Sequence, residues 1–88
     1  MNMSKSICKI NSGDKFWYLN DKIHREDGPA IEYVNGTKIW LLNGKWHRED
    51  GPAIEYADGS KRWYYQDKHI NCKDHQEFLK MIKLIVFL

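Results

Sequence analysis

The ten-residue segment His24–Tyr33, which reads HREDGPAIEY, recurs unchanged at His47–Tyr56, 23 positions later. The similarity extends beyond this segment: residues 16–38 and 39–61 are identical at 16 of 23 aligned positions. A fixed period of about 20–50 residues indicates a structural unit that stacks on copies of itself. The chain is therefore predicted to be a repeat protein, in which each unit buries its apolar surface against its neighbours.

A chain of 88 residues is the length of one small domain, so we assign residues 1–88 to a single domain. The similarity continues past both copies, because Trp63 follows Trp17 and Trp40 at the same interval. The predicted divisions are a leading half repeat (7–15), repeat one (16–38), repeat two (39–61), a trailing half repeat (62–72) and a C-terminal helical segment (74–88).

Each repeat is predicted to form short antiparallel strands joined by tight turns. The pairs Asn35-Gly36, Asn43-Gly44 and Asp58-Gly59 favour type I′ hairpins, because both central residues of that turn need a positive φ. Runs of four to six residues rich in aromatic and β-branched side chains separate the turns. The predicted fold is therefore mostly β, an antiparallel meander of short hairpin repeats. In that meander the indoles of Trp17, Trp40 and Trp63 should stack along the sheet.

The end of the chain changes to helical spacing. Asp74 is a predicted N-cap, and Glu77 three residues later completes a capping box. Apolar residues then follow at helical intervals, which predicts one helix over about residues 75–86 that covers the open face or the last edge of the sheet. A homodimer interface through this helix, or through an edge strand, is a second interpretation of its apolar content.

Charge and cysteine content restrict the classes of partner and compartment. Fourteen Lys and Arg against twelve Asp and Glu leave a net charge of +2, too small for a strongly basic nucleic-acid binder. Cys8 and Cys72 lie near opposite ends of the chain, and we expect reduced thiols in a cytoplasmic protein. The apolar run 84–88 is far shorter than the about 20 residues that span a bilayer, so no membrane span is predicted.

The motif W-x-x-N-G-K-x-H-x-x-x-G, followed by Y-x-(D/N)-G, resembles the MORN repeat class over about residues 7–70. The doubled HREDGPA is most similar to a MORN-like variant found in proteins of giant viruses and large bacteriophages, and the helix near Asp74 also resembles the ending of such proteins. Ordinary MORN repeats have glycine after the histidine, where this chain has Arg25 and Arg48. The resemblance implies elongated β-hairpin repeats and a viral origin.

The doubled His-Arg-Glu-Asp block has two interpretations. As a binding feature, it presents Arg25 and Arg48, each after a histidine, as a ladder for anions or acidic partners. As a structural feature, Asp27 and Asp50 accept backbone N–H groups, each arginine pairs with a glutamate of a neighbouring repeat, and the histidines pack against an indole. Identity of both copies favours the structural interpretation, because folding requirements repeat whereas a binding site need not.

Positions where the repeats differ are better candidates for a binding surface. Trp46 is the most distinctive of them, because its counterpart is Ile23 and exposed aromatic residues often anchor interfaces. A hydrophobic contact beneath the loop explains Trp46 equally well. The predicted partner-binding residues are Tyr18, Arg25, Leu41, Trp46, Arg48, Arg62 and Tyr64.

The sequence has no ordered nucleophile–base set and no glycine-rich phosphate loop, so we expect neither an enzyme nor a cofactor. The two block histidines should lie about 10 Å apart, at about 4.8 Å per strand, which is too far for shared metal ligation, so no metal is expected. We expect a non-catalytic viral or phage protein-interaction module, with inhibition of a host-defence protein as its specific form. The alternatives are a nucleic-acid-binding accessory protein and a purely structural repeat.

Overall fold

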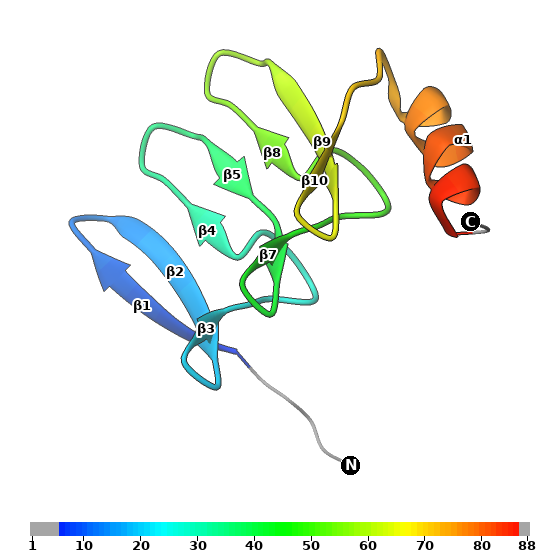
Figure 1. The fold of residues 1–88 in the computed structure, drawn as a ribbon. Coiled ribbons are helices and arrows are strands. Elements are labelled where there is room, and N and C mark those ends of the chain that lie inside the picture. Colours follow the sequence, from blue (N-terminus) through cyan, green and yellow to red (C-terminus); the bar gives the residue numbers. More distant parts are fainter. Residues whose placement is uncertain (1–5, 87–88) are drawn as a thin grey trace.

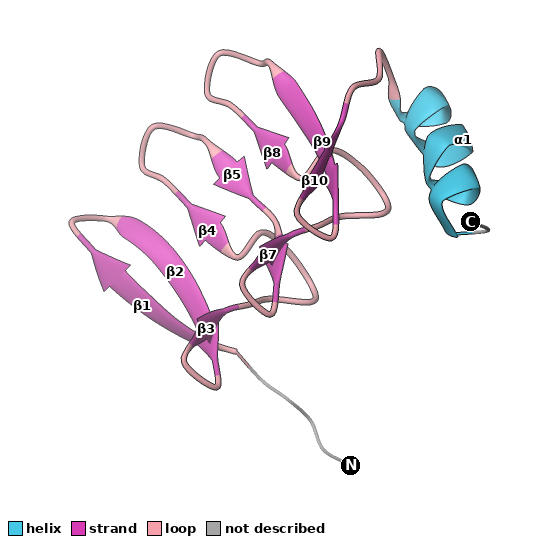
Figure 2. Ribbon diagram, in the orientation of Figure 1, coloured by secondary structure: helices cyan, strands magenta, loops and turns pink. Residues whose placement is uncertain are grey.

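The computed structural model describes residues 6–86 and shows a mostly β protein with one C-terminal helix, which confirms the predicted fold class. Figures 1 and 2 show a row of short hairpins with the helix at the end of the row. The main sheet is antiparallel, in the order β1-β2-β4-β5-β8-β9-β10 with β3 also on β2, and β6 and β7 form a separate pair. The elements are β1 (Ile7–Asn11), β2 (Asp14–Leu19), β3 (Lys22–Ile23), β4 (Ile31–Glu32), β5 (Lys38–Ile39), β6 (Leu41–Leu42), β7 (Lys45–Trp46), β8 (Ile54–Glu55), β9 (Lys61–Tyr65), β10 (Lys68–Ile70) and α1 (His75–Val86).

The strands form two rows of hairpins, and two kinds of turn join them. In the hairpins β2–β3, β6–β7 and β9–β10, both turn residues have a positive φ, as in Asn43 at 54° and Gly44 at 79°. The type I′ geometry predicted for Asn43-Gly44 is therefore confirmed, and the other two hairpins share it. The prediction is wrong for the turns at Asn35-Gly36 and Asp58-Gly59, where only the glycine has a positive φ.

The turns at Gly36 and Gly59 are one residue longer than predicted. The Gly36 N–H donates to the Tyr33 carbonyl at 3.0 Å, and the Tyr33 N–H donates to the Thr37 carbonyl at 2.9 Å. This pattern is a type I turn followed by a left-handed glycine, the usual three-residue hairpin loop. The Asn35 side chain accepts the Thr37 N–H at 2.9 Å, which stabilises the loop without a positive φ at Asn35.

Cross-strand register produces one charged row and one apolar row through the sheet. Lysine and glutamate alternate across five neighbouring strands, in the order Lys15, Glu32, Lys38, Glu55 and Lys61. Opposite charges at directly paired positions stabilise antiparallel strands and set their register. The adjacent row has Phe16, Ile31, Ile39 and Ile54 in register, and Ile31 and Ile54 are buried.

Side chains also bond one repeat to the next. The Val34 N–H donates to the Asp14 carboxylate at 2.8 Å, and one repeat later the Ala57 N–H donates to the Thr37 hydroxyl at 3.0 Å. The acceptors occupy the same repeat position, so a threonine replaces an aspartate without loss of the bond. These bonds fix the spacing of successive hairpins.

The helix α1 ends the stack and begins where the sequence predicts. The Glu77 N–H donates to the Asp74 carboxylate at 2.9 Å, and the Glu77 carboxylate accepts the Lys73 N–H at 2.9 Å. The predicted segment 74–88 extends past the helix end at Val86, and residues 87–88 lie outside the described residues.

Phe78 of α1 is fully buried with Trp63 and Ile70 in one core cluster. Asn71 stands 23 residues after Arg48, so the last indole has no arginine of its own. Instead, the Trp63 indole N–H donates to Nδ1 of His75 at 3.2 Å. The helix therefore covers the last edge of the sheet, as predicted, and completes the surroundings of Trp63.

Cys8 and Cys72 are both free thiols. Cys8 lies in β1 at one edge of the sheet, whereas Cys72 lies between β10 and α1. Within residues 6–86, no helix combines the length and apolar character needed to cross a membrane.

Replacing Phe78 with alanine should destabilise the protein by about 3–5 kcal/mol, because a fully buried ring leaves a cavity beside Trp63. Urea denaturation followed by Trp fluorescence measures the loss. Leu84→Ala is the matched control on the same helix, because Leu84 is exposed, and it should change stability by less than about 0.5 kcal/mol. Equal effects from the two variants would contradict the assigned packing of α1.

Candidate functional site

The His-Arg-Glu-Asp block begins the loop between β3 and β4 (residues 24–30) and the loop between β7 and β8 (residues 47–53), which we call the HRED loops. Each HRED loop is held in place by its own arginine. The guanidinium carbon of Arg25 lies 3.9 Å from the centre of the Trp17 ring, and that of Arg48 lies 3.7 Å from the Trp40 ring. The expectation that the indoles stack on one another is therefore wrong, because a guanidinium from the intervening loop lies on each of the first two. Stacking of arginine on an indole is favourable because the cation meets the negative face of the ring.

A glycine on the opposite side of each guanidinium completes a sandwich. A Cβ atom added to Gly51 would lie 2.7 Å from the Arg48 guanidinium carbon, and one added to Gly28 would lie 3.0 Å from that of Arg25. Neither glycine has a positive φ, so the backbone conformation does not demand glycine there. The glycine of HREDG is required for space, because the backbone must approach the guanidinium closely.

Polar contacts hold each guanidinium in its plane. Arg48 Nε donates to Asp50 at 2.8 Å, and Nη1 donates to the Pro52 carbonyl and to Glu55, both at 3.0 Å. The first copy repeats the pattern: Arg25 donates to Asp27, to the Pro29 carbonyl and to Glu32 at 3.0, 3.2 and 3.2 Å. These contacts correct two details of the structural interpretation: the group that each aspartate accepts from and the glutamate with which each arginine pairs.

First, each aspartate accepts from the arginine side chain two residues earlier. Second, each arginine pairs with a glutamate of its own repeat, because the loop folds back onto the strand that follows it in the chain. Three of the five guanidinium N–H groups are thus bound within the chain. The arginines therefore act mainly as internal clamps, in agreement with the structural interpretation that the sequence favoured over an anion ladder.

The histidines connect each loop to the next hairpin. Nδ1 of His24 accepts the Asn43 N–H at 2.7 Å, and Nδ1 of His47 accepts the Gln66 N–H at 3.0 Å. Because Nδ1 accepts, the proton of the neutral ring is on Nε2, which lies 3.1 Å from the carboxylate of Glu26 in the first copy. Both rings are buried, and that of His47 packs 4.8 Å from Tyr65 rather than on an indole.

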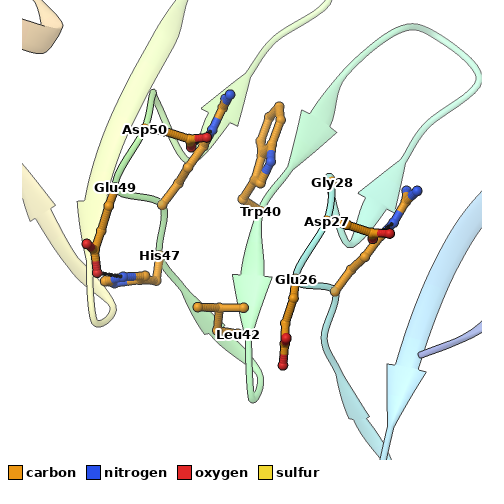
Figure 3. Close-up of a pocket in the computed structure, with 10 residues that line it drawn as sticks. Glu26, Asp27, Gly28, Trp40, Leu42, His47, Glu49 and Asp50 are labelled. Carbon is orange, nitrogen blue, oxygen red and sulfur yellow. Dashed lines mark hydrogen bonds and ion pairs between the residues drawn. The ribbon is translucent and has the colours of Figure 1, made fainter. Parts of the chain in front are cut away.

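A groove of about 470 Å³ lies between the two HRED loops. Figure 3 shows the Trp40 indole standing between the loop with Gly28 and the loop with Asp50, with Leu42 below it. The volume of the groove falls within the range of about 300–1,000 Å³ that is usual for ligand pockets. Its lining residues are Arg25, Glu26, Asp27, Gly28, Trp40, Leu42, His47, Arg48, Glu49 and Asp50.

The rim of this groove is acidic. The side chains of Glu26 and Glu49 are each 66% exposed, and those of Asp27 and Asp50 are each 87% exposed. Each HRED segment therefore carries one clamped cation and two exposed carboxylates. The groove presents negative charge although the whole chain has a net charge of +2. The hydrogen bond from Arg48, which outweighs partial burial, lowers the pKa of the Asp50 carboxyl below its ordinary value.

The predicted partner-binding residues divide into three groups in the structure. Arg25 and Arg48 line the groove as clamps. Leu41 is buried in the core. Elsewhere in the fold, away from the groove lining, are Tyr18, Trp46, Arg62 and Tyr64.

Trp46 and Tyr64 form an aromatic pair outside the groove. Their ring centres are 4.8 Å apart in an edge-to-face arrangement, and Trp46 is 38% exposed. Tyr18 pairs across the sheet with Ile7 and Ile23, and the Arg62 guanidinium lies 6.0 Å from the Tyr56 ring. The binding and packing interpretations of Trp46 both retain support.

Residues that the sequence predictions omitted make up most of the groove. Trp40 was predicted only as part of an indole column, and Glu26 and Glu49 were not among the predicted binding residues. The sequence signal that could have indicated the groove is the exact repetition of the charged segment, because two copies of one loop then lie at a fixed separation.

Within the described part of the chain, no group of three or more His, Cys, Asp or Glu side chains is arranged to hold a metal ion. Comparisons of the chain with protein-family models, with curated proteins and with solved structures gave no match. What the groove does must therefore be inferred from its geometry and charge.

Replacing Gly51 with alanine should destabilise the protein by about 1–3 kcal/mol, because the new methyl group displaces the Arg48 guanidinium from Trp40. A double-mutant cycle with Arg48→Ala checks this cause. Once the guanidinium is absent, Gly51→Ala should cost little, so the two effects should not add. Additive losses of unfolding free energy would show that Gly51 has another role.

The interaction of Asp50 with Arg48 predicts a specific dependence on pH. A carboxyl whose pKa is lowered on folding contributes stability above its unfolded value near 3.8, and this is lost as the pH falls through the lower folded value. Arg48→Met should raise the pKa of Asp50 toward its ordinary value, measured by carboxyl NMR titration. In the same series, Asp50→Asn should flatten part of the loss of stability below about pH 4. An unchanged Asp50 titration in Arg48→Met would contradict the assigned pairing.

Proposed function

We propose that this chain is a non-catalytic protein-interaction module that binds a basic segment of a partner protein in the groove between the HRED loops. The observation that carries this proposal is the combination of an indole wall with exposed carboxylates on both sides. Aromatic rings supply contact area at interfaces, and complementary charge supplies selectivity and speed of association. Two clamped loops also hold the groove in shape before a partner arrives, which reduces the entropy cost of binding.

The chemistry of His24, His47 and Cys72 supports binding rather than catalysis. Each histidine has both ring nitrogens engaged, one by a backbone N–H and one by a carboxylate, so neither is placed as a general base. Partial burial, followed by the charges of Glu77 and Asp74, raises the pKa of the Cys72 thiol. A raised pKa disfavours the thiolate, which is the reactive form.

Charge also ranks the alternatives. A nucleic-acid partner would bring phosphates to the four exposed carboxylates of the rim, which is unfavourable. A purely structural role does not explain why four exposed carboxylates gather at the rim of the groove. The resemblance to MORN-like proteins of viruses and phages suggests a host protein as the source of the basic segment, with inhibition of a defence protein as the specific form of this function.

The test is binding of a fluorescein-labelled peptide of mixed lysine and arginine to the full chain, followed by anisotropy at low salt. Glu26→Gln combined with Glu49→Gln should weaken binding about fivefold or more, because two rim charges are lost. Glutamine keeps an oxygen that accepts the histidine N–H, so the fold should persist. Asp21→Asn with Asp58→Asn makes the same change in net charge at exposed turns outside the groove, and it should have little effect.

Binding that is lost in the groove variant and retained in the turn variant supports the proposal. Equal weakening by both pairs would show non-specific attraction and would contradict it. Absence of peptide binding together with a salt-dependent shift of single-stranded DNA would favour the nucleic-acid alternative.

A further inference from the structure

We infer that the groove selects arginine, and that the side chain it takes from a partner is a guanidinium stacked on the free face of Trp40. This inference rests on the proposed function and adds the identity of the recognised group. It is carried by the way this chain binds its own arginines in the two repeats.

The chain itself binds a guanidinium at two sites, those of Arg25 and Arg48. In each, the cation stacks on an indole at 3.9 or 3.7 Å and donates to two carboxylates and one backbone carbonyl. The surrounding groups are the same residue types in both copies and lie at matching distances. An indole, carboxylates and a close-lying backbone are therefore the set that this fold uses to hold a guanidinium.

The groove offers the same set of groups. Arg48 occupies one side of the Trp40 ring, between the indole and Gly51. The other side of the ring is turned toward the loop with Asp27 and Gly28, and this space belongs to the groove. Glu26 and Asp27 supply carboxylates there, and the glycine lets the backbone form a close opposite wall.

The third indole shows what happens when the chain supplies no arginine. Trp63 is covered by α1, where His75 accepts its N–H and Phe78 fills the space beside it. The helix thus occupies the side of Trp63 on which an arginine would lie, whereas Trp40 has Arg48 on that side and the groove on the other. Of these three indoles, Trp40 is the one that lines this groove.

A guanidinium fits this space better than an ammonium for a geometric reason. The guanidinium is planar and weakly hydrated, so it stacks on an aromatic face while its edge N–H groups reach carboxylates. A lysine ammonium is compact and strongly hydrated, so it pairs with the carboxylates but gains less from contact with the indole than a guanidinium does. The charge of the rim attracts both groups, but the indole distinguishes them.

The experiment compares three pentapeptides in which glycine alternates with arginine, lysine or citrulline. NMR titration of the full chain follows the indole N–H signal of Trp40, and the dissociation constant is fitted for each peptide. The arginine peptide should bind about two- to fivefold more tightly than the lysine peptide, the contribution expected of an exposed cation–π contact. Citrulline has nearly the same shape without the charge and should bind most weakly.

Trp40→Leu and its repeat counterpart Trp17→Leu form a matched pair. Each variant removes an indole that stacks on an internal arginine, so their effects on stability should be similar. Only Trp40 lines the groove, so only Trp40→Leu should abolish the preference for arginine over lysine. In that variant peptide binding is followed by anisotropy, because the reporting indole is absent.

The outcomes separate the two levels of the proposal. A preference for arginine that Trp40→Leu removes and Trp17→Leu retains supports the inference. Equal affinity for arginine and lysine peptides overturns it but leaves the basic-segment function intact. Absence of binding by both cationic peptides overturns both, and a preference unaffected by Trp40→Leu places arginine recognition elsewhere on the surface.

Discussion

The arginine sandwich in each HRED loop is the interaction on which the rest of the structure depends. The guanidinium of Arg25 or Arg48 lies between an indole and a glycine, and it reaches the loop aspartate and the strand glutamate at once. A single side chain thereby fixes a loop, two strands and the position of a large ring. In so small a domain, these clamps replace much of the core that a larger domain would have.

Contacts between repeats turn these local clamps into a regular stack. The buried histidines bind the backbone of the next turn, and the residue at position 14 or 37 binds the backbone of the next hairpin loop. Every unit therefore satisfies polar backbone groups of its neighbour, which makes the spacing between units a property of hydrogen bonding as well as of burial. The helix α1 ends this series, because it covers Trp63 where the arginine of a further loop would lie.

The groove is a consequence of the same regularity. Two rigid loops at one repeat spacing, with an indole between them, enclose a space whose walls have the same composition on both sides. Internal pairing holds the arginine of each HRED segment inside its loop and leaves two carboxylates exposed, so the two segments together form an acidic rim. The formal charges of the two HRED segments already sum to a negative value, and the structure adds that the exposed groups are the carboxylates rather than the arginines.

The sequence alone determined the period, the antiparallel hairpins and the limits of the helix, because these depend on local rules: turn residues, alternation and capping side chains. Asn43-Gly44 and Asp74 with Glu77 show this most clearly. Only the tertiary structure decided the partner of each long side chain. An arginine can reach any neighbour within several ångströms, so its stacking on Trp40, its pairing with Glu55 of its own repeat and the resulting acidic groove depend on how the loop folds back. The burial of Leu41 was likewise decided by packing between repeats, which no local pattern specifies.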